Sequence, residues 1–465
     1  MKHKRRKFDP YKRTYRGTTH AIIILIYVLI FAAEWYSELN RIIRGFEMKG
    51  NWLMIALYAF AVYISIRLWG GFGVGRQKLL NLVSSQIFAV ITANIIGFMM
   101  MLLTAGDIHL MHPIRNRMVP MVVAQLIVAV ILPIIFQEIY RAMFPPLRII
   151  QVYGDHQNHL VEKMNVRKEK YDICREISIH EPMKKITELI DGFDAVLLND
   201  IPSEKKNLII KYCYDHGVRL YFTPKIPDII VKNTENINFF DSPIYLARNK
   251  GLSVDQLLFK RLMDIGISVM ALIITSPIIL ATAVAIKMDD GGPVFYKQER
   301  CTRNGKIFWI YKFRSMVVDA EKDGTPIPAE AGDERITRVG RFIRAVRIDE
   351  LPQFVNILKG DMSVVGPRPE RLEHYEMYSG DIPEFNFRLK VKGGLTGYAQ
   401  VYGKYNTTAL DKLKMDLMYI TDYSMLLDIQ IILETVKIIF KRESTEGFSH
   451  EQIEKMEKIS KTADN

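Results

Sequence analysis

The chain has 465 residues, a formal net charge of +12 and 49% hydrophobic residues. This length exceeds one ordinary domain, so we expect two or three domains. The excess of basic residues suits nucleic acid, anionic lipid or a phosphorylated substrate as the partner. The three cysteines stand far apart at Cys174, Cys213 and Cys301, which argues against a cysteine zinc site and indicates a reducing compartment.

Four apolar segments occupy the first third of the chain. Each is close to the roughly 20 residues that a bilayer-spanning helix needs, and they cover residues 21–36, 52–69, 82–104 and 119–140. Charged and aromatic residues stand at the segment ends, as at a membrane interface: Trp69, Glu138 and Arg141. We therefore predict a four-helix transmembrane bundle over residues 1–145, with a bundle of buried soluble helices as the alternative.

The orientation of this region follows from basic residues before the first apolar segment. They are Lys2, Lys4, Arg5, Arg6, Lys7, Lys12, Arg13 and Arg16. No small-residue cleavage site follows the first apolar run, so we interpret it as an uncleaved anchor. The positive-inside rule places this end in the cytoplasm. Four spans return the chain to the same side, so we predict a multi-pass protein of the inner membrane with its later domains in the cytoplasm.

Strands alternating with helices are predicted for residues 146–245. The strand candidates are short β-branched runs at 148–154, 194–198 and 218–222. This alternation is typical of a small doubly wound α/β domain. The turn after the first run lacks the Gly-x-Gly-x-x-Gly pattern that cradles a dinucleotide. We therefore expect this Rossmann-like domain to be structural or regulatory.

A fifth apolar run, residues 265–286, has Ser276-Pro277 in its middle and basic residues on both flanks. Proline kinks or breaks a helix at such a position. A true span would carry the arginine-rich C-terminal part outside, against the positive-inside bias. We therefore predict a re-entrant helical hairpin over 262–287. A kinked fifth span is the alternative.

Asp349 and Glu350 are adjacent carboxylates where a helix is predicted to begin, because Pro352 is tolerated only in the first turn. The helix dipole would favour their ionised forms. Arginines recur upstream at positions 335, 338, 341, 344 and 347, and Gly366-Pro-Arg-Pro369 follows downstream. Carboxylates among so many cations suggest a nucleophile or Mg²⁺ ligands facing a phosphorylated substrate. A capped surface helix with solvated charges is the alternative.

The remaining C-terminal sequence completes a predicted catalytic domain over residues 255–442. An alternating stretch at 307–316 predicts a strand. Residues 319–334 are predicted to form a mobile loop and 426–440 a final amphipathic helix. Residues 443–465 are polar, so we expect a flexible tail.

The segment from Lys260 to Lys441 resembles the bacterial sugar transferase family, the monotopic polyprenyl-phosphate phosphoglycosyl transferases. The motifs that carry the resemblance are Lys260-Arg261-x-x-Asp264, Ser276-Pro277, Gln298-x-Arg300, Tyr311-Lys-Phe-Arg-Ser-Met316, Asp349-Glu350-Leu-Pro-Gln353, Gly366-Pro-Arg-Pro369 and Gly394-Leu-Thr-Gly-Tyr-Ala-Gln400. Four preceding spans and a small α/β domain are similar to the large form of this family. Together these features predict a membrane protein of mixed α and α/β class with a monotopic catalytic domain.

The resemblance implies transfer of a sugar 1-phosphate from a UDP-sugar to undecaprenyl phosphate, with release of UMP. This would begin exopolysaccharide, capsule or O-antigen synthesis. Asp349 would be the nucleophile that forms a covalent sugar-phosphate intermediate, Glu350 its partner, and one or both would contact Mg²⁺. The residues expected to hold phosphates or the nucleotide are Arg300, Arg314, Arg344, Arg368 and Lys392. This chain has Lys392-Gly393 where the family has Arg-Pro. Lys392 keeps the positive charge but lacks the bidentate fork of arginine.

Other functions compete with this interpretation. A non-catalytic membrane scaffold of a polysaccharide machine gives no reason for the carboxylate pair and the Gly-Pro-Arg-Pro turn. A nucleotide-sugar oxidoreductase would need a glycine-rich turn, and a transporter would need more polar groups in broken membrane helices. The substrates named above and the lipid bilayer are the expected partners, without nucleic acid. The sugar stays open, as does a homodimer through the α/β domain.

Overall fold

The computed structural model describes residues 8–43, 49–155, 160–239, 241–247, 251–318, 333–403 and 407–439. The predicted tail 443–465, most of the predicted loop 319–334 and the first five members of the N-terminal basic cluster lie outside these ranges. The chain divides into two compact units, Met1–Lys225 and Ile226–Asn465.

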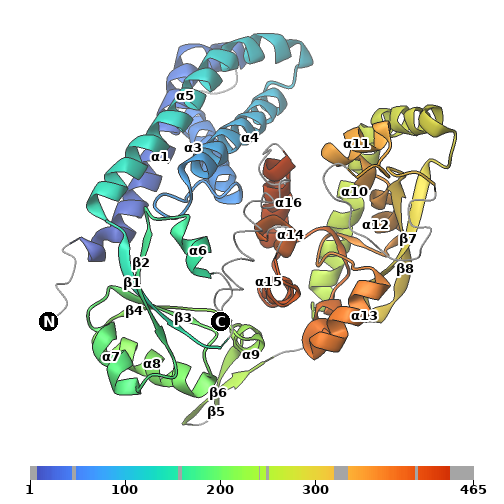
Figure 1. Ribbon diagram of the computed structural model, residues 1–465. Helices are drawn as coiled ribbons and strands as arrows, with labels where there is room; N and C mark the ends of the chain where they lie inside the picture. The colour runs from blue at the N-terminus through green and yellow to red at the C-terminus, as the bar shows by residue number, and fades with distance from the viewer. Residues whose placement is uncertain are drawn as a thin grey trace. The chain divides into compact units, whose positions relative to one another are not determined.

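Four long apolar helices begin the first unit, and each contains most of one predicted segment. They are α1 (Lys12–Glu34), α3 (Lys49–Leu68), α4 (Leu79–Ala105) and α5 (Met111–Met143). Short elements adjoin them: η1 (Asp9–Tyr11), η2 (Trp35–Leu39), α2 (Asn40–Ile43) and η3 (Ile108–Leu110). Helix α1 packs against α3 and α5, and α4 packs against the same two helices (Figure 1). All four are long and apolar enough to cross a membrane.

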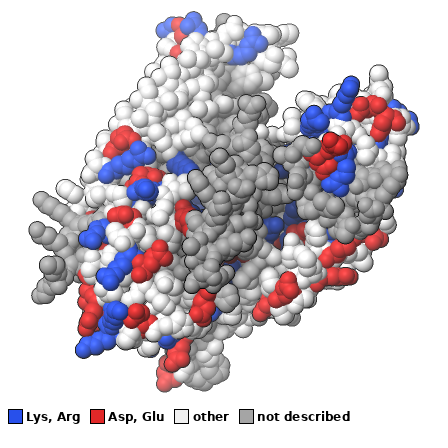
Figure 2. All heavy atoms as spheres, viewed as in Figure 1, with Lys and Arg blue, Asp and Glu red and all other residues white. Residues whose placement is uncertain are grey.

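Hydrogen-bonded polar side chains lie between these helices, and large apolar side chains lie on their outer faces. Asn94 Nδ2 donates to Gln125 Oε1 at 2.7 Å, and Tyr58 OH donates to the same oxygen at 3.1 Å. Large apolar side chains such as Trp52 and Leu103 are exposed. Figure 2 shows uncharged residues along the visible face of the helices and charged residues toward their ends. Polar groups inside and apolar groups outside are typical of a membrane protein, because lipid solvates only the latter.

A four-stranded parallel sheet with strand order β2-β1-β3-β4 follows in the first unit. Its strands are β1 (Leu147–Tyr153), β2 (Tyr171–Ser178), β3 (Ala195–Asn199) and β4 (Arg219–Phe222). Its helices are α6 (Leu160–Asn165), α7 (Met183–Ile190) and α8 (Ser203–His216). Alternate residues of β1 contribute to separate apolar clusters, with Ile150 in one and Ile149 in the other. The sheet is therefore covered on both faces, as predicted for a doubly wound domain.

The second unit begins with α9 (Ile226–Val231) and an antiparallel hairpin of β5 (Glu235–Phe239) and β6 (Ser242–Leu246). Ile226 and Ile229 of α9 pack in an apolar cluster with Phe385 and Leu413. Helix α9 therefore belongs by its contacts to the second unit, whereas the predicted boundary of the α/β domain is at 245.

One helix of 37 residues, α10 (Val254–Asp290), contains the predicted re-entrant segment. Pro277 lies inside it, and Figure 1 shows two arms that meet at a bend. Helical structure continues through the proline, so the break is a bend within one helix. This helix is also long and apolar enough to cross a membrane. Its re-entry on one face therefore stays a prediction.

The first arm of α10 is tied to the rest of the second unit by the Lys260-Arg261-x-x-Asp264 motif. Lys260 Nζ lies 2.6 Å from Asp428 Oδ2, and both side chains are buried. Arg261 donates to the carbonyl oxygens of Ile357 and Leu358 at 2.6 and 2.7 Å. Asp264 Oδ1 accepts from Val364 N at 2.9 Å. This motif attaches the apolar helix to the elements that flank the carboxylate pair.

Short strands and helices complete this unit. The first strands, β7 (Phe295–Cys301) and β8 (Ile307–Phe313), form an antiparallel hairpin through η4 (Arg303–Gly305). Parallel β9 (Ser363–Val365) and β10 (Gly394–Thr396) form a second pair. The helices are α11 (Arg338–Ala345), η5 (Ile348–Glu350), α12 (Gln353–Lys359), α13 (Leu372–Asp381), η6 (Pro383–Lys390), α14 (Tyr398–Tyr402), α15 (Ala409–Thr421) and α16 (Met425–Ile439). The buried cluster includes Ile310, Ile357, Val364 and Ile431, so β8, α12, β9 and α16 share one core.

Candidate active site

The turn η5 carries Asp349 and Glu350 between α11 and α12. Arg347 has a left-handed backbone conformation, with φ 59°, which reverses the chain after α11. Pro352 then precedes the first residue of α12, where a missing N–H costs little. The two carboxylates therefore lie in a turn that begins after a residue in an uncommon backbone conformation and ends at a proline suited to the start of a helix.

Strand β8 is fastened to α12 through one buried amide. Asn356 Oδ1 accepts from Tyr311 N at 2.9 Å, and its Nδ2 donates to Trp309 O at 2.7 Å. A completely buried amide satisfied in this way has little freedom to move. Asn356 therefore fixes β8, and Lys312 with it, beside the turn that carries the carboxylates.

Glu350 is surrounded by three cations. Its Oε1 lies 3.0 Å from Lys312 Nζ, 3.3 Å from Arg368 Nη2 and 3.9 Å from Arg347 Nη1. Burial would raise the pKa of Glu350, but Lys312, Arg368 and Arg347 outweigh it and hold that pKa well below its usual range. Glu350 is therefore an ionised, fixed group.

Asp349 has a different environment from its neighbour. Its Oδ1 is buried and has no hydrogen-bond partner among the described residues. Burial, together with the adjacent Glu350 charge, raises the pKa of Asp349, although Lys312, Arg347 and Arg344 oppose the shift. A buried carboxylate oxygen without a hydrogen bond lowers the stability of the folded chain. A carboxylate without a partner in a cationic site can bind a metal ion or attack a phosphorus atom.

The Gly366-Pro-Arg-Pro369 turn follows β9 and delivers Arg368 to Glu350. Gly366 N donates to Thr396 O at 2.8 Å, and a Cβ on Gly366 would lie 2.4 Å from Lys392 O, so only glycine fits there. Arg300 Nη1 donates to Pro369 O at 3.2 Å. Burial and the nearby charges of Arg368 and Arg371 lower the pKa of Arg300 to about 10. The mutual repulsion of these guanidinium groups would be relieved by a bound anion such as a phosphate.

The structure places the other predicted binding residues differently. Arg314 forms a bidentate ion pair with Asp290, at the end of α10, and donates to Pro293 O at 2.6 Å. None of its hydrogen bonds within the described ranges reaches Asp349 or Glu350. These contacts hold the end of α10 against β8. The charge of Arg314 is therefore already paired with Asp290 in this structure. Binding of a substrate phosphate by Arg314 stays a prediction.

Lys392 lies at the opposite end of α12 from the carboxylate pair. Its Nζ is 3.6 Å from the position of a Cβ built on Gly360, which ends the helix. Helix α12 has seven residues, a length of about 10 Å at about 1.5 Å per residue. Burial and then Arg261 lower the pKa of Lys392, whereas Asp264 raises it. Lys392 and Glu350 therefore lie at opposite ends of this helix. A contact between Lys392 and the substrate stays a prediction.

Two residues that contact Glu350, Lys312 and Arg347, were not among the predicted site residues. Lys312 has the same strand parity as Phe308 and Ile310, which are buried. A lysine at an inward position of an alternating strand is a signal that could have indicated a buried partner. Arg347 was one of the five recurring arginines, but nothing in the sequence distinguished it from the other four, because its backbone conformation shows only in the structure.

The donor set for a divalent cation is small. Within the described ranges, no group of three or more His, Cys, Asp or Glu side chains could hold a metal ion. Mg²⁺ usually binds through one or two carboxylates plus substrate phosphates, so a larger protein cage is unnecessary. The unpaired Oδ1 of Asp349 beside Glu350 fits that requirement.

Comparison with known proteins agrees with this arrangement of motifs. Residues 255–442 match the sequence model of the family described as "Bacterial sugar transferase". A UDP-N-acetylgalactosamine-undecaprenyl-phosphate N-acetylgalactosaminephosphotransferase of Aeromonas hydrophila is 45% identical over 183 residues, which are 39% of this chain and 43% of that protein. A UDP-glucose:undecaprenyl-phosphate glucose-1-phosphate transferase of Klebsiella pneumoniae is 43% identical over 227 residues, 45% of this chain and 47% of that protein.

These matches therefore cover somewhat less than half of either relative. A shorter relative is covered nearly completely: the uncharacterized sugar transferase EpsL of Bacillus subtilis is 38% identical over 194 residues, 42% of this chain and 93% of that protein. The family match over residues 255–442 contains the carboxylate pair, Lys312 and the Gly-Pro-Arg-Pro turn. The chain belongs to the bacterial sugar transferase family.

Proposed function

We propose that the chain transfers a sugar 1-phosphate from a UDP-sugar to undecaprenyl phosphate and releases UMP. The observation that carries the proposal is the unequal pair of carboxylates. Glu350 is held ionised by Lys312, Arg368 and Arg347, whereas the buried Oδ1 of Asp349 is unpaired among the described residues. The names of the Aeromonas and Klebsiella relatives support the substrate classes.

In the proposed first step, an Asp349 oxygen attacks the β-phosphorus of the nucleotide sugar. The new oxygen–phosphorus bond forms as the bond from the β-phosphorus to the bridging oxygen breaks, and UMP leaves with that electron pair. An acyl phosphate that carries the sugar remains on Asp349. Arg368 and Arg300 lie where cations would offset the charge of the phosphates, which otherwise repel a carboxylate.

In the proposed second step, a phosphate oxygen of undecaprenyl phosphate attacks the same phosphorus. The bond to Asp349 breaks, and the carboxylate is restored for another cycle. The product has a pyrophosphate linkage, like the substrate that was cleaved, so no further energy source is needed. Asp349 and Glu350 would hold Mg²⁺ when it is bound, and that ion would supply additional charge neutralisation at the phosphates.

The membrane arrangement belongs to the same proposal. The four apolar helices of the first unit form a transmembrane bundle of the inner membrane, and α10 re-enters at the cytoplasmic face. A site beside such a helix is accessible to a lipid phosphate and to a soluble nucleotide sugar. The reaction would be the first membrane step of exopolysaccharide, capsule or O-antigen synthesis. A homodimer stays a prediction.

The test is release of UMP from a panel of UDP-sugars, with undecaprenyl phosphate and Mg²⁺, by the full chain in detergent or nanodiscs. We expect one or a few sugars to react. Asp349→Asn should abolish turnover and the radiolabelled sugar-phosphate adduct on the protein, while its melting temperature stays near that of the parent. The matched control is Asp381→Asn, at an exposed position on α13. UMP release by a folded Asp349→Asn variant would exclude Asp349 as the nucleophile, and no release from any sugar would favour the scaffold.

A further inference from the structure

A buried guanidinium lies behind the Gly366-Pro-Arg-Pro369 turn. Arg388 is at the end of η6, and its side chain is 5% exposed. Its Nε and Nη2 lie 3.0 and 2.8 Å from Asp416 Oδ2, and its Nη1 lies 3.4 Å from Glu370 Oε1. The ring of Phe385 lies against the guanidinium, 4.8 Å from centroid to Cζ. Arg388 therefore has its fork filled by two carboxylates and one face covered by an aromatic ring.

The same guanidinium also holds the backbone of the turn. Arg388 Nη2 donates to the carbonyl oxygen of Arg368 at 3.0 Å. The adjacent carbonyls are held as well, Pro367 O by Gly394 N at 2.9 Å and Pro369 O by Arg300 Nη1 at 3.2 Å. Three successive carbonyl oxygens of one turn therefore each accept a defined hydrogen bond. Only the middle one belongs to the residue whose side chain contacts Glu350.

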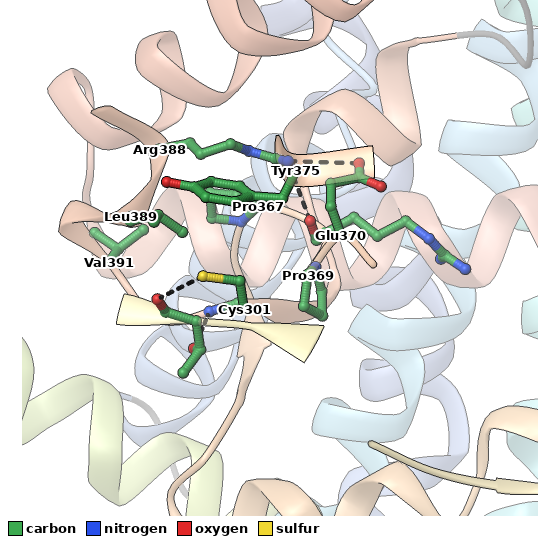
Figure 3. A pocket seen from close by; sticks show the side chains of 11 residues that line it. Cys301, Pro367, Pro369, Glu370, Tyr375, Arg388, Leu389 and Val391 are labelled. Atoms are coloured by element: carbon green, nitrogen blue, oxygen red, sulfur yellow. Dashed lines mark hydrogen bonds and ion pairs between the residues drawn. The ribbon is translucent and has the colours of Figure 1, made fainter. Parts of the chain in front are cut away.

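The surroundings of Arg388 make this contact difficult to replace. Figure 3 shows Arg388 and Glu370 pointing toward one another at a small cavity that the Gly-Pro-Arg-Pro turn also lines. Asp416 is buried, and burial raises its pKa to about 6 although Arg388 opposes the shift. A lysine in place of Arg388 could pair with Asp416. Its compact ammonium has no planar fork and cannot reach Asp416, Glu370 and the Arg368 carbonyl at the same time.

We propose that Arg388 is a positioning residue, which fixes the Arg368 carbonyl from behind so that the Arg368 guanidinium is held in place for a phosphate of the nucleotide sugar. This inference rests on the proposed transferase function. Arg388 does not contact the reacting atoms in this scheme. Its effect on nucleotide binding passes through the Arg368 carbonyl, whereas its ion pairs with Asp416 and Glu370 contribute to folding.

A double-mutant cycle tests this separation. Arg388→Lys and Arg368→Gln are made singly and together in the full chain, and both the dissociation constant for UDP and the KM for the reactive UDP-sugar are measured. We expect Arg388→Lys to weaken UDP binding and raise KM by about tenfold, with a smaller change in kcat. In the Arg368→Gln background the same change should alter either quantity by about twofold or less. Equal effects in both backgrounds would show a structural role and overturn the inference.

Arg219→Lys is the matched control, because Arg219 Nη2 also lies 2.8 Å from an aspartate, Asp9 Oδ2, in the first unit. It should leave UDP binding and KM unchanged. If Arg388→Lys has no cooperative melting transition, Asp416→Asn enters the same cycle, because it removes the charge opposite Arg388 Nε and Nη2 and keeps the shape of the side chain. UDP binding without UMP release from any sugar would reject the proposed function alone. No UDP binding by the parent protein would reject the inference and the function together.

Discussion

Lys312 Nζ lies 3.0 Å from Glu350 Oε1, and the two side chains are 19% and 13% exposed. Strand β8 and the turn η5 bring these residues together across 38 positions of sequence. Burial lowers the pKa of Lys312, although the Glu350 charge opposes the shift. The pair therefore joins a strand to the turn that carries the candidate nucleophile, in a place with little competing water.

Lys312→Met should damage both stability and activity, because it leaves Glu350 with Arg368 and the more distant Arg347. Losing one partner of a largely buried pair should cost about 1–3 kcal/mol of unfolding free energy. We expect kcat/KM to fall by about tenfold or more, because the carboxylate pair loses its nearest cation. Lys297→Met on the neighbouring strand, at an exposed position, is the control. Parent-like kcat/KM in the Lys312 variant would remove this lysine from the site.

The contribution of Glu350 to stability should depend on pH with a defined sign. Its pKa is lowered in the folded chain from an ordinary value of 4.5. A lowered pKa stabilises the folded state fully above that ordinary value, and the stabilisation is lost as the pH falls through the folded-state pKa. The melting temperature of Glu350→Gln should therefore be lower than that of the parent by a constant amount between about pH 6 and 8.

Below about pH 4.5 this difference should shrink. Comparing parent and variant at each pH removes the effects of titrating groups that do not interact with Glu350. Glu299→Gln, an exposed change on β7, should give no such pH-dependent difference. A deficit for Glu350→Gln that grew on acidification would contradict the assigned sign.

Gly393→Pro should destabilise the chain, although the family pattern has proline at this position. Gly393 N donates to Thr302 Oγ1 at 3.0 Å, and proline has no N–H. A Cβ here would also lie 3.0 Å from Pro369 Cβ. We expect a loss of about 1–2 kcal/mol in denaturant unfolding. Gly393→Ala keeps the donor and should cost less, and the proline penalty should be smaller in a Thr302→Val background.

The re-entrant path of α10 predicts that residues 255 and 306 lie on the same cytoplasmic side. Single cysteines at Asp255 and Lys306, in a background without the three native thiols, can be labelled in intact cells with an impermeant reagent. Both should stay unlabelled until the membrane is opened. Labelling of 306 but not 255 would establish a fifth span. Replacing Ser276-Pro277 with Leu-Leu should straighten the helix and move part of the population to that topology.

The sequence alone determined the features that depend on residues close together along the chain, namely the apolar helices, the start of α12 and the family motifs. The apolar runs match α1, α3, α4 and α5, because the length of a hydrophobic segment is a local property. Pro352 placed the start of α12, and the order of motifs gave the family. The edge strand β2 was missed because Arg175 interrupts the alternation of Tyr171, Ile173 and Ile177, and most residues of this strand are at least partly exposed.

The tertiary structure alone decided which charges meet. The sequence places five arginines before Asp349, but only the fold brings Lys312 and Arg368 to Glu350 from positions 38 and 18 residues away. It pairs Arg314 with Asp290 and places Lys392 Nζ near Gly360, and a substrate contact for either residue stays a prediction. The physical reason is that an ion pair requires atoms within a few ångströms. That proximity is set by how β8, β9 and α12 pack, and no local pattern of charges along the chain encodes it.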